Sequence, residues 1–246
     1  MSQSPATVLG VVQARMGSTR LPGKVLRQLH GRPVLSWVCR AAEASEQLDG
    51  IVVATTFENE DDAIVEWCGQ NAIRVVRGPT DDVLSRFLRV VDQDRPEAIV
   101  RLTADCPLLD PGLIDAVVGL WRSRPADYVS TVTPRSLPRG LDVELVRSDV
   151  LRQVDGLAAG ADRTHVTSYV YQHPERFEIL GVSVQPDASD LRVTLDTSED
   201  AALLDALTAL IGDRIPTWRD TVDVLRQHPE MSGINAEVRQ KTLEEG

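Results

Sequence analysis

A short segment near the start of the chain combines glycines and cations at the point where an apolar run ends. The segment occupies residues 13–24, reads QARMGSTRLPGK, and follows the apolar run VLGVV at residues 8–12. Its glycines let backbone N–H groups approach and surround an anion. Arg15, Arg20 and Lys24 supply the positive charge that a buried polyphosphate needs. The segment therefore predicts a strand followed by a loop that binds a triphosphate.

The spacing of this loop differs from that of the two commonest phosphate-binding motifs. Five residues separate Gly17 from Gly23, and Val25 follows Lys24, whereas a P-loop has four residues between its glycines and a Ser or Thr after its Lys. The Gly-x-Gly-x-x-Gly pattern of dinucleotide-binding folds is absent as well. We therefore expect side-chain cations to bind the phosphates, and magnesium ligands to come from elsewhere. A surface loop with solvated cations is the plainer alternative.

The same residues resemble the opening signature of the cytidylyltransferases related to spore coat polysaccharide biosynthesis protein F. They are also similar to the opening of the CMP-KDO synthetases and, more distantly, of the CMP-sialic acid synthetases. The resemblance extends along the chain to about Asp200. It implies a Rossmann-like (GT-A-like) nucleotidyltransferase fold. It also implies that the following loop residues contact a nucleotide: Gln13, Ala14, Arg15, Gly17, Ser18, Arg20 and Lys24.

Charge and cysteine content exclude several classes of partner. The formal net charge is −11 over 246 residues, which argues against binding to a nucleic-acid backbone or an anionic membrane. Three widely spaced cysteines without a Cys-x-x-Cys pair argue against a disulfide framework or a structural zinc site. Residues 1–5 lack a charged and apolar leader, and no apolar run approaches membrane-spanning length. We therefore expect a cytoplasmic protein.

The first half of the chain alternates strand-like and helix-like segments. Apolar runs predict strands at residues 8–12, 51–55, 74–77 and 98–102, and helical spacing predicts helices at residues 33–48, 59–70, 81–91 and 111–124. Repeated β-α-β units of this kind indicate a mostly parallel sheet that helices cover on both faces, a three-layer α/β/α fold. Ligands of such sheets bind beyond the carboxyl ends of the strands, where the cation-rich loop lies.

The second half is less regular. We expect strands at residues 128–130, 141–145, 179–184 and 191–195, and helices at residues 149–157, 163–173 and 198–211. The segment after Met231 is polar and weakly patterned, which predicts a peripheral or frayed end. We interpret the chain as one domain, with a nucleotide-binding half at about 6–125, an acceptor-binding and dimerisation half at about 126–212, inserted on the acceptor side, and a helical tail at 213–246.

Two carboxylates follow apolar runs in different halves of the chain. Asp105, in the segment LTADCP at residues 102–107, is suited to a hard cation such as Mg²⁺, which prefers oxygen ligands; capping the next helix is its alternative role. The segment resembles the family's metal-binding Thr-Gly-Asp-Cys-Pro, with Ala104 in place of Gly, and it adds Thr103 to the nucleotide contacts. By the resemblance of LDTSED at residues 195–200 to the family's second such segment, Asp196 is the metal-binding partner of Asp105.

Three further segments resemble family motifs. PRGLDVE at residues 138–144 resembles the acceptor-side motif, which implies acceptor contacts for Arg139, Asp142 and Glu144; a half-exposed strand with solvated acids is the alternative. DRTHV at residues 162–166 implies acceptor or dimer contacts for Arg163 and His165, although a lone His is as often structural. RGPTDD at residues 77–82 implies that Arg77 contacts the nucleotide or orients Asp82.

These features together predict a magnesium-dependent cytidylyltransferase. Arg15 and Lys24, supported by Arg20, would hold the β- and γ-phosphates of CTP, and Asp105 and Asp196 would hold Mg²⁺ while an anionic acceptor attacks the α-phosphorus. The resemblance implies a homodimer. Two alternatives stay open: a glycosyltransferase that uses a preformed nucleotide sugar, and a non-catalytic nucleotide-binding subunit. The acceptor, the pathway and the oligomeric state do not follow from the sequence.

Overall fold

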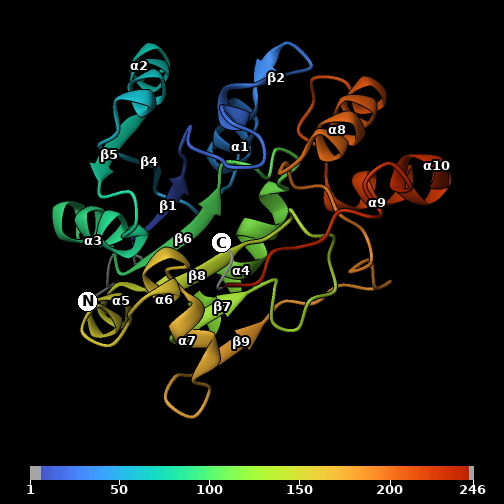
Figure 1. The fold of residues 1–246 in the computed structure, drawn as a ribbon. Helices are drawn as coiled ribbons and strands as arrows, with labels where there is room; N and C mark the ends of the chain where they lie inside the picture. The colour runs from blue at the N-terminus through green and yellow to red at the C-terminus, as the bar shows by residue number, and fades with distance from the viewer. Residues whose placement is uncertain (1–6, 244–246) are drawn as a thin grey trace.

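The apolar runs of the first half become neighbouring parallel strands in the computed structural model, which describes residues 7–243 (Figure 1). β1 (Val8–Gln13) pairs with β4 (Gly50–Thr56) on one side and with β6 (Ala98–Thr103) on the other, and β5 (Arg74–Gly78) pairs with β4. The connecting helices are α1 (Val34–Glu43), α2 (Asp62–Gln70) and α3 (Val83–Asp94). The carboxyl ends of these four strands therefore share one edge of the sheet.

The second half extends this sheet and adds most of the remaining helices. The strand order of the described residues is β5-β4-β1-β6-β8-β7-β9, with β7 (Tyr128–Ser130), β8 (Glu144–Arg147) and β9 (Ile179–Gly181). Only β8 runs antiparallel to its neighbours in this sheet. The helices are α4 (Pro111–Ser123), α5 (Ser148–Asp155), α6 (Ala161–Thr164), α7 (Ser168–Gln172), α8 (Ser198–Ile211), α9 (Trp218–Gln227) and α10 (Pro229–Ser232). The predicted mostly parallel α/β fold is confirmed.

Helices cover both faces of the sheet, as the three-layer prediction requires. Side chains alternate along β1, so that Val8 and Val12 face one buried cluster and Val11 faces the other. Residues of α1, α4, α8 and α9 fill the first cluster, and residues of α3, α5 and α7 fill the second. Figure 1 shows these two groups of helices on opposite sides of the strands. Small additions are a hairpin of β2 (Gln28–Leu29) and β3 (Arg32–Pro33) and the 3₁₀ turns Lys24–Leu26 and Asn59–Asp61.

Several predicted elements of the second half are shorter or different. The strand expected at 141–145 begins only at Glu144, and the helix expected at 163–173 is divided into α6 and α7, with Val166 at a positive φ of 37° between them. The strand expected at 191–195 does not form. Its backbone bonds instead to two loops: Val193 N donates to Arg139 O at 2.7 Å, and Leu195 N donates to Asp105 O at 2.8 Å. These bonds bring Asp196 towards Asp105.

The end of the described chain is not peripheral, and that expectation is wrong. Beyond α10, Asn235 is buried and donates to Arg192 O and to Asp200 Oδ1. The chain then returns to the middle of the molecule, where the red segment ends in Figure 1. Residues 1–5, which we examined for a leader, lie outside the described residues. Among the described helices, none has both the length and the apolar character that crossing a membrane requires.

A buried ion pair joins β6 to β8. Glu144 accepts hydrogen bonds from Arg101, from Tyr128 Oη at 2.6 Å and from Thr167 Oγ1 at 2.6 Å. Burial alone would raise the pKa of Glu144, but the charge of Arg101 and these hydrogen bonds bring the pKa below its ordinary value of 4.5. The carboxylate therefore remains charged and connects the parallel part of the sheet to the strands of the second half.

We predict that Glu144→Gln destabilises the protein by about 3–5 kcal/mol at neutral pH, because it leaves the Arg101 charge largely buried without a carboxylate partner. A group with a lowered folded pKa contributes stability above its ordinary value and loses that contribution as the pH falls through the folded pKa. The difference between wild type and variant should therefore shrink below about pH 4.5. Denaturant unfolding measures it. Glu178→Gln, in the exposed pair with Arg124, is the control and should change stability by less than about 1 kcal/mol.

Candidate active site

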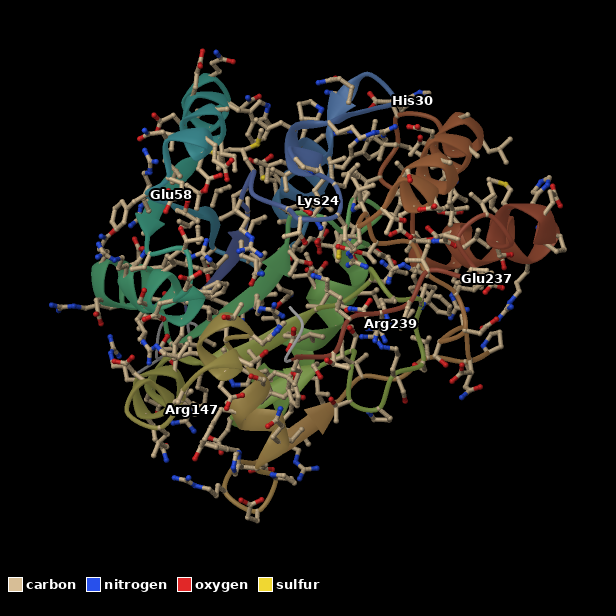
Figure 2. The ribbon with its side chains drawn as sticks, in the orientation of Figure 1. Lys24, His30, Glu58, Arg147, Glu237 and Arg239 are labelled. Atoms are coloured by element: carbon tan, nitrogen blue, oxygen red, sulfur yellow. The ribbon has the colours of Figure 1, made fainter. Side chains whose placement is uncertain are left out.

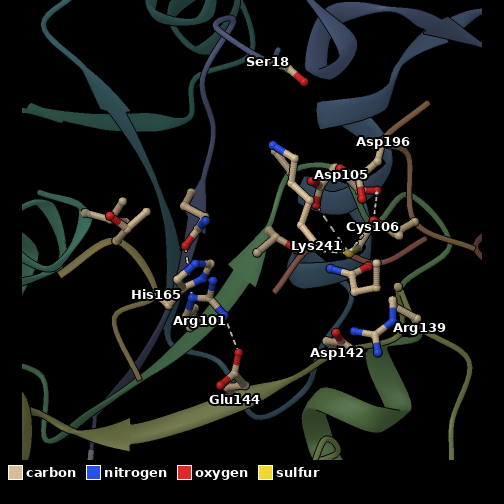
Figure 3. Close-up of a pocket in the computed structure, with 18 of the residues that line it drawn as sticks. Ser18, Arg101, Asp105, Cys106, Arg139, Asp142, Glu144, His165, Asp196 and Lys241 are labelled. Atoms are coloured by element: carbon tan, nitrogen blue, oxygen red, sulfur yellow. Dashed lines mark hydrogen bonds and ion pairs between the residues drawn. The ribbon is translucent and has the colours of Figure 1, made fainter. Parts of the chain in front are cut away.

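A cavity of about 650 Å³ lies at the carboxyl edge of the parallel strands. The loop after β1, the end of β6, the segment before β8 and the last described residues line it, as Figure 3 shows for many of its side chains. The fold brings together residues predicted from segments far apart in the chain. The predicted residues that line the cavity are Gln13, Ala14, Arg15, Ser18, Arg20, Lys24, Thr103, Asp105, Arg139, Asp142, Glu144, His165 and Asp196.

The Lys24 ammonium lies between the two predicted metal-binding carboxylates. Its Nζ is 2.6 Å from Asp105 Oδ2 and 2.7 Å from Asp196 Oδ1. Burial by itself would lower the pKa of Lys24, but the two carboxylates more than offset this and raise the pKa above its ordinary value. Asp196 also forms ion pairs with Arg20, at 3.0 Å, and with Arg192, at 2.8 Å. The centre of the site is therefore a network of alternating charges.

The phosphate loop has a defined shape because buried groups fix it at both ends. Gly23 has a φ of 71°, a conformation that favours glycine, and its N–H donates to Met16 O at 2.9 Å. Met16 N in turn donates to Asp61 Oδ1 at 2.6 Å. Asp61 is fully buried and also accepts from the backbone N–H and the hydroxyl of Thr56 at the end of β4. Asp61 is thus a positioning residue that sequence reasoning missed.

Three arginines that line the cavity, Arg15, Arg86 and Arg139, have no carboxylate partner within ion-pair distance among the described residues. Arg15, in the phosphate loop, is exposed to the cavity. Arg86, from α3, is only 2 % exposed, and its Nε has no hydrogen-bond partner. Burial, followed by repulsion from Arg15, lowers the pKa of Arg86 to about 10, so the side chain remains charged at neutral pH. A buried donor beside a second cation indicates a site for an anion.

The sequence did not predict a role for Arg86, because a single Arg among the apolar residues of a helix matches no binding motif. The cavity also contains Arg101 and Arg135, which were not predicted. Arg101 Nε donates to Gln13 Oε1 at 3.0 Å, so the Glu144–Arg101 pair also orients Gln13. The apolar pattern of residues 98–102 predicted the strand that contains Arg101, but it did not predict that Arg101 contacts the site.

Three predicted site residues lie outside the residues that line the cavity. Gly17 lies against Glu60: a Cβ added there would be 2.5 Å from Glu60 Oε1. Arg77 fixes the turn after β4, because it donates to Thr56 O at 2.7 Å and to Glu58 O at 2.9 Å. Arg163 connects α6 to the start of α3 through Asp82, at 2.8 Å. Arg77 and Arg163 thus support elements next to the site, whereas Gly17 leaves room for Glu60.

The predicted acceptor residues at the other end of the cavity differ in their partners and in their pKa values. Glu144 is held in its buried network, and Asp142 forms a bidentate ion pair with Arg135, at 2.6 and 3.1 Å. Burial, with Arg135 nearby, lowers the pKa of Arg139. Burial also lowers the pKa of His165, which makes this ring neutral at neutral pH; its Nε2 is 3.1 Å from Leu243 O. Arg139 is thus the member of this set best suited to an acidic acceptor.

Asp105 and Asp196 have the chemistry that Mg²⁺ requires. Both carboxylates pair with the same cation, the Lys24 ammonium, so a positive charge between them is already favourable. Among the described residues, no group of three or more His, Cys, Asp or Glu side chains is arranged to hold a metal. Two carboxylates alone leave most positions of an octahedral ion to water and substrate phosphates, which is the usual arrangement for nucleotide-bound Mg²⁺. The residues therefore fit the ion.

This mostly parallel α/β fold, with a cation-lined cavity at the carboxyl edge of its parallel strands, is that of the nucleotidyltransferases. A sequence model described as Cytidylyltransferase matches residues 9–215. Spore coat polysaccharide biosynthesis protein SpsF of Bacillus subtilis is 34 % identical over 232 residues, which cover 91 % of this chain and 95 % of that protein. The chain therefore belongs to the cytidylyltransferase family, whose members are CTP-dependent enzymes.

Solved structures agree with this assignment. A cytidylyltransferase from Leptospira borgpetersenii superposes with a TM-score of 0.89 at 29 % identity, covering 96 % of this chain and 99 % of that one. A CMP:2-keto-3-deoxy-manno-octonic acid synthetase complexed with CTP superposes with a TM-score of 0.66 at 17 % identity, covering 84 % and 100 %. The second likeness shows the shared fold. The predicted resemblance to the spore coat family is thus confirmed.

We predict that Arg86→Met weakens the binding of pyrophosphate about tenfold or more, because a charge-assisted bond to an anion contributes about 1.5–3 kcal/mol. The variant should keep its stability or gain some, since it removes a buried charge without a partner. The rise in Tm on adding pyrophosphate measures the first effect. Arg89→Met, on the same helix but stacked on Phe57 outside the cavity, should respond as wild type does. An equal pyrophosphate response from Arg86→Met would contradict the assignment.

Proposed function

We propose that the protein transfers CMP from CTP to a small anionic acceptor and releases pyrophosphate, with Mg²⁺ as cofactor. The observation that carries this proposal is the convergence of Asp105 and Asp196 on one cation, in a cavity where Arg15 and Arg86 lack a carboxylate partner among the described residues. Carboxylates for a metal and free cations for phosphates are the two requirements of nucleotidyl transfer. Membership in the cytidylyltransferase family favours this reaction over a glycosyltransferase or a non-catalytic subunit.

The cation-rich wall is where we place the triphosphate. Arg15 and Arg20 line the cavity with Ser18, and Arg86 adds a third guanidinium from α3. Asp105 and Asp196 would hold the Mg²⁺ that accompanies the nucleotide, and Lys24, which lies beside both carboxylates, would bind a phosphate. Guanidinium groups bind phosphates with two parallel hydrogen bonds, and they stabilise the charge that develops on departing pyrophosphate.

The opposite end of the cavity is where we place the acceptor. Arg139, with Asp142 and Arg135 beside it, would bind and orient the acidic group of an acceptor such as an acidic sugar. An acceptor oxygen would then attack the α-phosphorus in line, as the bond from that phosphorus to the β-phosphate breaks. A carboxylate or phosphate acceptor needs no general base. Bound Mg²⁺ would supply neutralisation of the α-phosphate charge and alignment of the attacking oxygen.

We place the enzyme in the cytoplasm, because Cys39, Cys68 and Cys106 are free and buried and no described helix suits a membrane. We also propose a homodimer, as the family resemblance implies.

We predict that Asp105→Ala lowers kcat roughly a hundredfold or more while the protein stays folded, because even groups that merely support a metal ligand contribute about 10–100-fold to activity. Pyrophosphate release measures kcat, and thermal unfolding checks the fold. Asp205→Ala removes an exposed carboxylate that pairs with Arg27 on the surface, and it should keep wild-type activity. If a folded Asp105→Ala variant turned over as fast as wild type, Asp105 would not be a ligand of the catalytic metal.

The reaction itself is tested by pyrophosphate release with Mg²⁺, each of the four ribonucleoside triphosphates, and a panel of acidic sugars, phosphonates and sugar phosphates. We expect release with CTP and one class of acceptor. If the protein bound all four triphosphates equally well, or did not bind CTP at all, the proposal would be contradicted whichever acceptors the panel contains.

A further inference from the structure

The chain beyond α10 forms a strap over the cavity, made of residues 237–243. Figure 2 shows it passing from Glu237, beside α9 and α10, to Arg239 in the middle of the molecule. Its last residues, Gln240, Lys241, Thr242 and Leu243, line the same cavity as the phosphate loop and the two carboxylates. No sequence motif marked this segment, so the site contains a wall that was not expected.

The strap is held from both sides of the cavity. At its root, Asn235 is buried and bonds to Asp200. In its middle, Gln240 Oε1 accepts from Arg192 at 2.7 Å, and Arg192 also binds Asp196. At its end, Leu243 O is 3.1 Å from His165 Nε2 on the acceptor side. These attachments fix the strap across the opening instead of leaving it as a loose end.

Lys241 projects from the strap towards the phosphate loop. Its Nζ is 3.5 Å from Thr19 Oγ1, and the side chain is half-buried. Figure 3 draws Lys241 inside the cavity, with Asp105 and Asp196 on one side of it and His165 on the other. Among the described residues, no carboxylate lies within ion-pair distance of its ammonium group. Lys241 therefore resembles Arg15 and Arg86: a cation at the cavity that lacks an anion.

The distribution of lysines in the sequence points the same way. The chain has 26 Lys and Arg residues, of which only Lys24 and Lys241 are lysines. Both line this cavity, although they lie at opposite ends of the chain. Lysine presents a compact charge on a flexible stem, which suits a phosphate whose position changes during a reaction.

We propose that Lys241 is a further triphosphate-binding residue, and that the strap closes the phosphate end of the cavity by carrying it there. This inference rests on the proposed function. Lys24 is already paired with two carboxylates and Arg20 with one, so Lys241 and the unpaired arginines are the cations most available to the β- and γ-phosphates. CMP, which lacks those two phosphates, does not reach Lys241.

The first test measures binding without an acceptor, so that no turnover occurs. Lys241→Met should weaken the binding of CTP and of pyrophosphate about tenfold, the effect of one charge-assisted bond to phosphate, and leave CMP binding within about twofold of wild type. Lys241→Arg should restore most CTP binding. A variant that loses CTP and CMP affinity equally, or that binds CTP as wild type does, would overturn the proposal.

The second test uses the fact that the chain has only two lysines. An acetylating reagent should label Lys241 more readily than Lys24, which is buried between carboxylates, and mass spectrometry quantifies each site. CTP should protect Lys241, and CMP should not. If wild type binds CTP but Lys241 is labelled equally with and without it, the strap proposal is wrong and the proposed function stands. If wild type does not bind CTP, both are wrong.

Discussion

The position of one ammonium group between two carboxylates organises this structure. Lys24 comes from the loop after β1, Asp105 from the end of β6, and Asp196 from a segment that precedes α8. Backbone bonds from Val193 to Arg139 and from Leu195 to Asp105 hold the third segment beside the second. The three charges are partly buried, and each has an opposite charge at hydrogen-bond distance. Any ligand that enters must preserve this balance, which a divalent cation together with phosphates does.

The remaining charged side chains near the cavity are of two kinds: some hold its walls in place through several partners, and others have no carboxylate partner. Glu144, Asp61 and Arg192 are satisfied by several partners and hold the walls in place. Arg15, Arg86 and Lys241 face the cavity without a carboxylate at ion-pair distance in the described part of the chain. An acidic protein with unpaired cations at one cavity is built to bind an anion. A nucleotide with a bound cation would match both sets, because Asp105 and Asp196 would hold the cation while the arginines would compensate the phosphates.

The sequence predicted the parts of the fold and site that local patterns determine. Apolar runs and helical spacing gave the parallel strands and the helices of the first half, and the loop of residues 13–24 and the two carboxylates gave the centre of the site. The strand expected at 191–195 failed because its backbone bonds to loops, which periodicity does not report. Glu144 lines the cavity, as its expected acceptor contact requires. The sequence did not predict its partners, because they come from β6, β7 and the residue that precedes α7. Arg86 and the strap were missed because their roles depend on tertiary contacts alone.

A crystal structure with CTP and Mn²⁺, as a stand-in for Mg²⁺, would show directly whether the carboxylates bind a metal and the cations bind the triphosphate. We expect an ion bound to Asp105 and Asp196, with Lys24 Nζ moved away from both carboxylates and onto a phosphate, and with the β- and γ-phosphates against Arg15 and Arg86. A nucleotide bound elsewhere, or bound here with Lys24 still between the two carboxylates and no ion on them, would contradict this expectation.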